Sequence, residues 1–183
     1  MDVLTAIAGR ASAAKLVAPA PGPDDLDQIL RAGARAPDHG RLAPWRFVVL
    51  EDDGRAVLAD AMARAKLRAV PDSTEAELET ERSKAMRAPM IVAVAARVVP
   101  GHKVPEIEQI LAVGAAVQNM ILAARALGYG SMWKTGNTAY DLIVKQALGL
   151  NPDDRIVAFL YLGTIASEGR VREAVLDGLV SRP

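Results

Sequence analysis

The stretch from Glu106 to Leu127 restricts the fold more than any other part of this chain. Its sequence, EIEQILAVGAAVQNMILAARAL, has the length of a helix of about six turns and is followed by Gly128. Between Ile110 and Ala124 it is apolar around most of its circumference, which is typical of a helix buried on nearly all sides. The small residues 114–116 would let a second helix approach closely. In a chain of 183 residues we expect this helix to lie at the centre and to serve a dimer interface as well.

Apolar runs of strand length lie on both sides of this segment. Residues 90–96 (MIVAVAA) are apolar throughout, which favours a strand buried on both faces, although periodicity alone does not exclude a helix. Residues 156–163 (IVAFLYLG) form the clearest strand, and shorter strands are expected at 46–50 and around Trp133. Further helices are expected over 2–8, 24–35, 55–69, 75–87 and 139–148. Strands mostly separated by helices predict an α/β or α+β fold in which helices cover a central sheet.

The remaining segments predict little regular structure and no second domain. Residues 10–15 form a stretch of small residues, and the last twenty read as an extended arm with at most a short helix. The charged helix at 75–87 is expected to be a solvated cover over the active region. Because there is no internal repeat or flexible linker, residues 1–183 are expected to form a single domain.

Composition excludes several classes of function. Lys plus Arg equals Asp plus Glu at 22 each, so the electrostatic footprint of a nucleic-acid binder is missing. The absence of cysteine excludes disulfides, thiolate nucleophiles, iron–sulfur clusters and cysteine zinc sites. The two histidines, His39 and His102, do not have ligand spacing, so no metal site is expected. No signal peptide is apparent, and Gln118 and Asn119 interrupt the longest apolar tract, so we expect a cytoplasmic protein with no membrane span.

A loop in the first third of the chain concentrates binding groups. RAPDHGRLAPWRF (35–47) carries three arginines, a histidine and a tryptophan, together with residues that stiffen a turn. Loops presented by a rigid scaffold are where binding groups collect. The chain contains no Gly-x-Ser-x-Gly, Walker A, His-Glu-x-x-His or Rossmann motif, and Gly128 and Gly130 precede a strand rather than a helix. We therefore expect a cofactor to supply any reactivity.

Four segments resemble the signatures of the nitroreductase family. Arg10-Ala11-Ser12 is similar to its Arg-Arg-Ser, and RAPDHGRLAPWRF resembles its Ala-Pro-…-Pro-Trp-x-Phe. GAAVQNMILAARALGYGSMWKTG resembles its long central helix followed by Gly-x-Gly-x-x-Trp, and FLYLGT its final core strand. The segments occur in family order and cover nearly the whole chain. Ala11 replaces the second arginine, Arg41 and Ala43 stand near the usual Asn and Gln, and Ile165 stands where proline often follows.

This resemblance implies an α+β, nitroreductase-like fold with a mainly antiparallel central sheet flanked by helices and a long buried central helix. It implies an intertwined homodimer with FMN in two pockets at the subunit interface. It further implies ping-pong hydride transfer from NAD(P)H through FMN to a small-molecule oxidant, either a nitro compound or a quinone. No side chain of the protein is expected to react, because FMN carries the chemistry.

The resemblance also assigns residues to the two ends of FMN. Arg10, Ala11 and Ser12 match the signature that holds the phosphate and ribityl side, and Arg170 or Arg172 would add a cation from the tail. A phosphate favours such cations because ionised hydrogen bonds are strong.

The remaining assignments concern the isoalloxazine ring. Ser131, Met132 and Trp133 match the turn that lines it, while Arg35 and His39 match positions that reach the flavin from the partner subunit. By themselves, Arg35 would also suit a helix C-terminus and His39 a bond within its own loop.

Three functions stay open at this level. The first is an FMN-dependent NAD(P)H oxidoreductase. The second is a related flavin enzyme that dehalogenates its substrate or breaks down flavin, and the third is a non-catalytic flavin-binding or structural dimer. The choice between NADH and NADPH is also open, with Lys15 and Lys134 as candidate partners for a 2′-phosphate.

Overall fold

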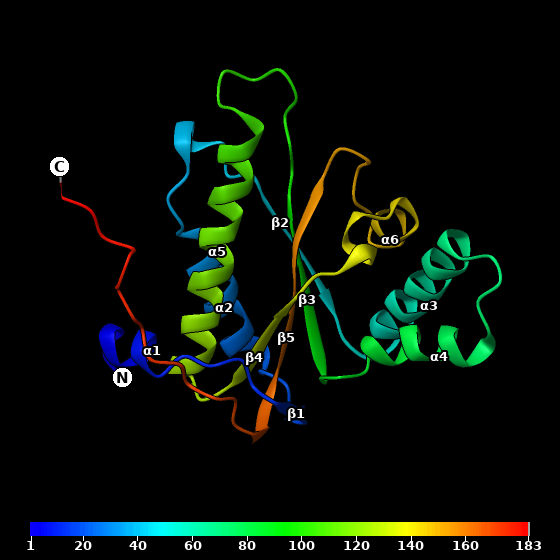
Figure 1. Ribbon diagram of the computed structural model, residues 1–183, viewed down its shortest axis with the longest axis horizontal. Helices are drawn as coiled ribbons and strands as arrows, with labels where there is room; N and C mark the ends of the chain where they lie inside the picture. The colour runs from blue at the N-terminus through cyan, green and yellow to red at the C-terminus, as the bar shows by residue number, and fades with distance from the viewer. Residues whose placement is uncertain (183) are drawn as a thin grey trace.

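The computed structural model describes residues 1–182 as helices on both faces of a five-stranded sheet (Figure 1). The helices are α1 (Val3–Ala8), α2 (Pro23–Ala34), α3 (Asp52–Ala69), α4 (Glu75–Lys84), α5 (Glu106–Ala126) and α6 (Leu142–Ala147), with 3-10 turns η1 (His39–Arg41) and η2 (Asn137–Tyr140). The strands are β1 (Lys15–Val17), β2 (Trp45–Leu50), β3 (Met90–Ala96), β4 (Gly130–Lys134) and β5 (Arg155–Ser167). Their order is β1-β5-β3-β2, with β4 also paired to β5, and each pairing is antiparallel. The fold is therefore α+β, as the resemblance implied.

Strand β3 separates two cores, and all seven of its residues are buried. Because side chains alternate along a strand, Met90, Val92 and Val94 pack with α2 and α5, whereas Ile91 and Ala93 pack with α3 and α6. In Figure 1, α2 and α5 lie on one side of the sheet and α3, α4 and α6 on the other. The expectation of a strand buried on both faces is confirmed.

Helix α5 packs against α2, which runs in the opposite direction on the same side of the sheet (Figure 1). Asn119 donates a side-chain hydrogen bond of 3.1 Å to the carbonyl oxygen of Ala32 near the end of α2. At the other end of the pair, the Tyr129 hydroxyl donates to Asp25 at 2.8 Å.

The outer face of α5 is not covered within one chain. Ile107 and Leu111 are 60% and 63% exposed, and only 44% of the most apolar window of the helix is buried. In length and hydropathy α5 also matches a membrane-crossing helix, despite the interruption at Gln118 and Asn119, but the core helix of a soluble protein has the same properties. Burial on nearly all sides therefore requires something outside the single chain.

A buried amide fixes the loop that leads into α5. Gln109 accepts a hydrogen bond from the Val99 backbone N–H at 2.9 Å and donates to the carbonyl oxygens of Val99 and Val104. The side chain is buried, so these bonds tie the loop to the first turns of α5.

Differences from the expected elements concern short pieces. Strand β1 arises in the stretch read as featureless, where Leu16 pairs with Ile165 on an extension of β5. The helix expected at 75–87 ends at Lys84, and the one at 139–148 divides into η2 and α6. Within residues 168–182 the tail contains a turn and no helix. A strand of three residues is too short for a periodic pattern, which explains why β1 was missed.

Candidate functional site

The Arg10–Ser12 segment lies beside the start of β4. The Ala13 backbone N–H donates to the carbonyl oxygen of Ser131 at 3.0 Å, and Ala14 donates to Ser167 at 3.0 Å. Arg10, Ala11 and Ser131 line one small hollow. The fold thus brings together the N-terminal signature and the turn that was expected to line the flavin.

The tail closes over this segment immediately after β5. A Cβ atom on Gly169 would overlap the carbonyl oxygen of Ser12, so the two backbones are in direct contact. Arg170 follows this contact and is exposed, as is Arg172. Within residues 1–182, neither arginine forms an ion pair.

The same hollow contains Arg125, an arginine that the sequence did not single out. Its Nη2 atom lies 2.6 Å from the position of a Cβ atom on Gly9, so the guanidinium group packs closely against the Gly9 backbone. Its Nε atom is buried without a hydrogen-bond partner in the described chain. Glu168 is the acidic residue of this lining, while Arg10 and Arg125 are its cations. A cation in the last turn of a helix is common, so its sequence position gave no signal.

Side chains alternate along β4 between two environments. Ser131 lines the hollow on the α5 side, whereas Met132 belongs to the core beneath α3. Trp133 is 40% exposed, and its indole N–H donates to the carbonyl oxygen of Val157 at 3.0 Å. Trp133 is therefore a half-exposed residue whose indole is held by one hydrogen bond, and the Met132 side chain is a core residue.

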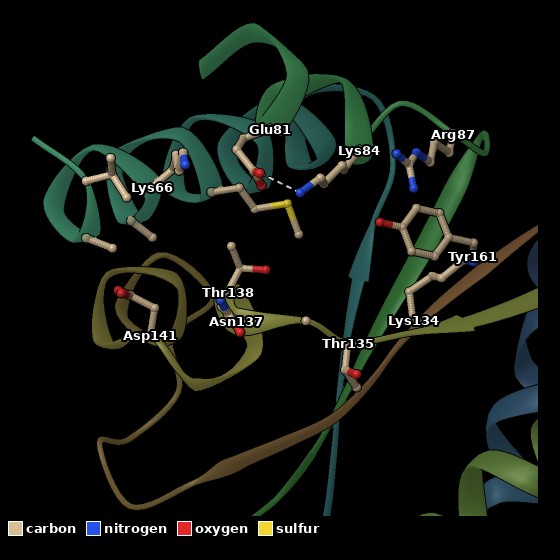
Figure 2. Close-up of a pocket in the computed structure, with 15 residues that line it drawn as sticks. Lys66, Glu81, Lys84, Arg87, Lys134, Thr135, Asn137, Thr138, Asp141 and Tyr161 are labelled. Atoms are coloured by element: carbon tan, nitrogen blue, oxygen red, sulfur yellow. Dashed lines mark hydrogen bonds and ion pairs between the residues drawn. The ribbon is translucent and has the colours of Figure 1, made fainter. Parts of the chain in front are cut away.

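A cavity of about 480 Å³ begins where β4 ends (Figure 2). It lies between α3, α4 and the segment that follows Trp133, and its volume is in the range typical of small-molecule sites. Lys134, Thr135 and Gly136 form one wall, and Lys84 lies on another. The expected cover helix α4 thus contributes Glu81 and Lys84 to the wall of this cavity.

Unbalanced positive charge surrounds this cavity. Of its two carboxylates, Glu81 pairs with Lys84 at 2.5 Å, and Asp141 pairs with Arg68 at 2.5 Å. The other cations of the lining are Lys66, Arg87 and Lys134. None of these three forms an ion pair within the described residues. The cavity therefore favours a ligand that carries or develops negative charge.

The loop of residues 35–47, after α2, has a defined shape but contributes to neither the hollow nor the cavity. Asp38 accepts backbone hydrogen bonds of 2.8 Å from Leu42 and Ala43, which fixes a loop where Ala43 has φ 48°. Exposed Arg35 ends α2, and His39 contacts the Glu108 carboxylate in the first turn of α5.

The two groups of expected flavin residues are separated within one chain. His39 contacts Glu108, and the hollow of Arg10 contains Arg125. At a rise of about 1.5 Å per residue, Glu108 and Arg125 lie roughly 25 Å apart along α5. A single chain therefore does not bring His39 to Arg10 and Ser12.

Comparison with known proteins identifies relatives along almost the entire chain. The model of the family described as "Nitroreductase family" matches residues 7–164. A protein of Escherichia coli K12 named "Putative NAD(P)H nitroreductase YdjA" is 40% identical over 164 residues, which cover 90% of this chain and 88% of that protein.

Solved structures show the same fold. A nitroreductase-like family protein from Bacillus cereus superposes with a TM-score of 0.86 at 23% identity, covering 100% of this chain and 96% of the other. A nitroreductase from Desulfovibrio desulfuricans, solved in complex with FMN, has a TM-score of 0.77 at 28% identity and covers 100% and 98%. From these matches along its length, the chain belongs to the nitroreductase family.

Proposed function

We propose that this protein is an FMN-dependent NAD(P)H oxidoreductase. The observation that carries the proposal is that β4 joins a hollow flanked by arginines to a cavity surrounded by unpaired cations. The five residues of β4 span about 16 Å, comparable with an extended FMN molecule. When bound, FMN supplies hydride chemistry: NAD(P)H reduces it and leaves, and a nitro compound or quinone then reoxidises it.

At the phosphate end, Arg10 and Ser12 are exposed on a segment that two backbone hydrogen bonds anchor to the sheet. Guanidinium groups bind phosphate oxygens with paired, charge-assisted hydrogen bonds. The tail places Arg170 next to this segment through the contact between Gly169 and Ser12. These residues fit a phosphate monoester.

At the ring end, Lys84, Lys134 and Arg87 surround a cavity of a size that admits an isoalloxazine ring. A cation close to a ring that gains charge on reduction stabilises the reduced form. Lys66, Lys84 and Arg87 were not among the residues expected from the sequence, because α3 and α4 carry no signature of the family.

A second copy of the chain would complete the site. The exposed apolar face of α5 and the apolar tail residues Val175, Leu176 and Leu179 need cover, since large exposed apolar surfaces mark interfaces. Pairing of two such faces would bring Arg35 and His39 of one subunit toward the flavin of the other. The protein we propose is a cytoplasmic homodimer.

The deciding experiment is to purify the protein, add FMN and riboflavin, and follow NADH and NADPH oxidation with nitroarenes and quinones. We expect a yellow dimer and steady turnover with one of these oxidants. Protein that binds FMN without turnover would be a flavin-binding dimer, and turnover only with halogenated substrates or flavin would indicate the second enzyme class. Colourless protein that takes up no FMN would exclude all the flavin functions.

A further inference from the structure

Tyr161 places a hydroxyl group without a partner at the wall of the cavity. The residue is only 2% exposed and forms no hydrogen bond with any described residue, but its hydroxyl is accessible from the cavity and is not sealed in the core. In Figure 2 its hydroxyl points into the cavity, on the side where Lys84 and Arg87 lie. A ligand bound in this cavity is therefore in a position to accept a hydrogen bond from the Tyr161 hydroxyl.

The position on the sheet does not itself require a tyrosine. Tyr161 lies in the central strand β5, opposite Ile91 on β3 and Met132 on β4. Phe159, two residues earlier and on the same face of the sheet, fills its part of this core without a hydroxyl. Packing alone would be satisfied by phenylalanine at 161 as well.

The surroundings keep this hydroxyl protonated and the cavity positive. Burial raises the pKa of Tyr161, and the charge of nearby Arg87 offsets this only in part. At neutral pH the phenol is therefore a hydrogen-bond donor. Arg87 and Lys134 bring charge to the same cavity without a carboxylate partner in the described chain.

We propose that Tyr161 donates a hydrogen bond to an oxygen of the flavin ring and thereby stabilises its reduced, anionic form. The inference rests on the proposed function, because the ring must occupy this cavity. Hydride transfer to the neutral ring adds two electrons and one proton, so the product carries one negative charge. A hydrogen bond to an oxygen of the charged, reduced ring is stronger than the same bond to the neutral, oxidised ring, so the Tyr161 hydroxyl would favour reduction.

The test compares Tyr161→Phe with Tyr140→Phe as a matched control. Tyr140 is 73% exposed and does not line the cavity. The measurements are the affinity for oxidised FMN, the midpoint potential of bound FMN, and the melting temperature of the protein without flavin. We expect Tyr161→Phe to bind oxidised FMN about as well as the unaltered protein. The reduced form should bind about tenfold more weakly relative to the oxidised form, which lowers the midpoint potential by about 30 mV.

Without flavin, Tyr161→Phe should melt at about the same temperature, because it removes no hydrogen bond within the described chain. An unchanged potential, or a lower melting temperature without flavin, would overturn the inference. If the unaltered protein bound no FMN, the proposed function would fail, and this inference with it.

Discussion

The carbonyl oxygen of Ser12 occupies the space that a side chain on Gly169 would need. The backbones of the C-terminal tail and the N-terminal segment are therefore in contact just after β5. This contact is possible only if residue 169 has no Cβ atom. This contact holds the proposed phosphate segment and Arg170 together.

Replacing Gly169 with alanine should displace the tail from Ser12. We expect FMN to bind about tenfold more weakly, whereas the fold should persist because the sheet does not depend on this contact. The FMN dissociation constant, measured by fluorescence quenching, is the readout. Gly22→Ala is the control, since a Cβ atom there meets nothing within 4 Å. Equal FMN affinity in the two variants would mean that the tail does not support the site.

We expect the Arg125 guanidinium group to bind the phosphate of FMN and not the isoalloxazine ring. Its guanidinium group shares the hollow with Arg10, next to the short side chain of Ala11. We expect Arg125→Met to weaken FMN binding about tenfold and to leave riboflavin binding unchanged, since riboflavin has no phosphate. Adding Ala11→Arg to this variant should restore FMN affinity. Parallel losses for FMN and riboflavin would instead assign Arg125 to the packing of α1.

Arg35→Ala should lower FMN occupancy in a folded dimer, because the exposed guanidinium at the end of α2 would face the flavin of the other subunit. The flavin-to-protein absorbance ratio measures occupancy, and circular dichroism checks the fold. Arg31→Ala is the matched control, since Arg31 is an exposed arginine on the same helix that pairs with Asp27. Full flavin content in Arg35→Ala would show that Arg35 does not contact the flavin and serves only as the C-terminal residue of α2.

Gln109→Leu should destabilise the fold. The change leaves the backbone groups of Val99 and the Val104 carbonyl without their buried partner. We expect a loss of about 2 kcal/mol in the free energy of unfolding, because each unpaired buried group costs about 1–3 kcal/mol and water relieves part of this cost. Urea denaturation measures the loss, and exposed Gln146→Leu should change little. A loss as small as that of the control would show that the loop bonds contribute nothing.

The stability of the protein should fall as pH rises above about 10, the pKa of an unfolded tyrosine. Burial raises the pKa of Tyr161 in the folded state, so the folded protein holds this proton after the unfolded chain has lost it. Stability is therefore complete below pH 10 and declines as pH approaches the folded pKa. Melting temperatures from pH 8 to 11 should fall less steeply for Tyr161→Phe than for Tyr140→Phe. Identical slopes would contradict the buried titration.

The sequence predicted the fold best where an apolar pattern extends over a long segment. Residues 90–96 and the helix that begins at Glu106 were recognisable because their apolar patterns extend over many residues. Strand β1 was not, since it exists only because β5 extends to Ser167 and offers it an edge.

The residues of the candidate site likewise include some that the sequence predicted and some that only the structure revealed. Arg10, Ser12 and Ser131 were predicted from local signatures, and the fold places their segments side by side. Lys66 and Arg87 come from elements that look like ordinary charged surface in the sequence. Their proposed role depends on a cavity that forms only when α3 and α4 pack near the end of β4.

The distance between the two ends of α5 has a genetic consequence. If each pocket takes Arg10 from one subunit and Arg35 from the other, a dimer of two Arg10→Ala chains has two defective pockets, as does a dimer of two Arg35→Ala chains. A mixed dimer of the two variants has one pocket with both defects and one with none. Two inactive alleles of this gene should therefore complement each other when they are expressed in the same cell.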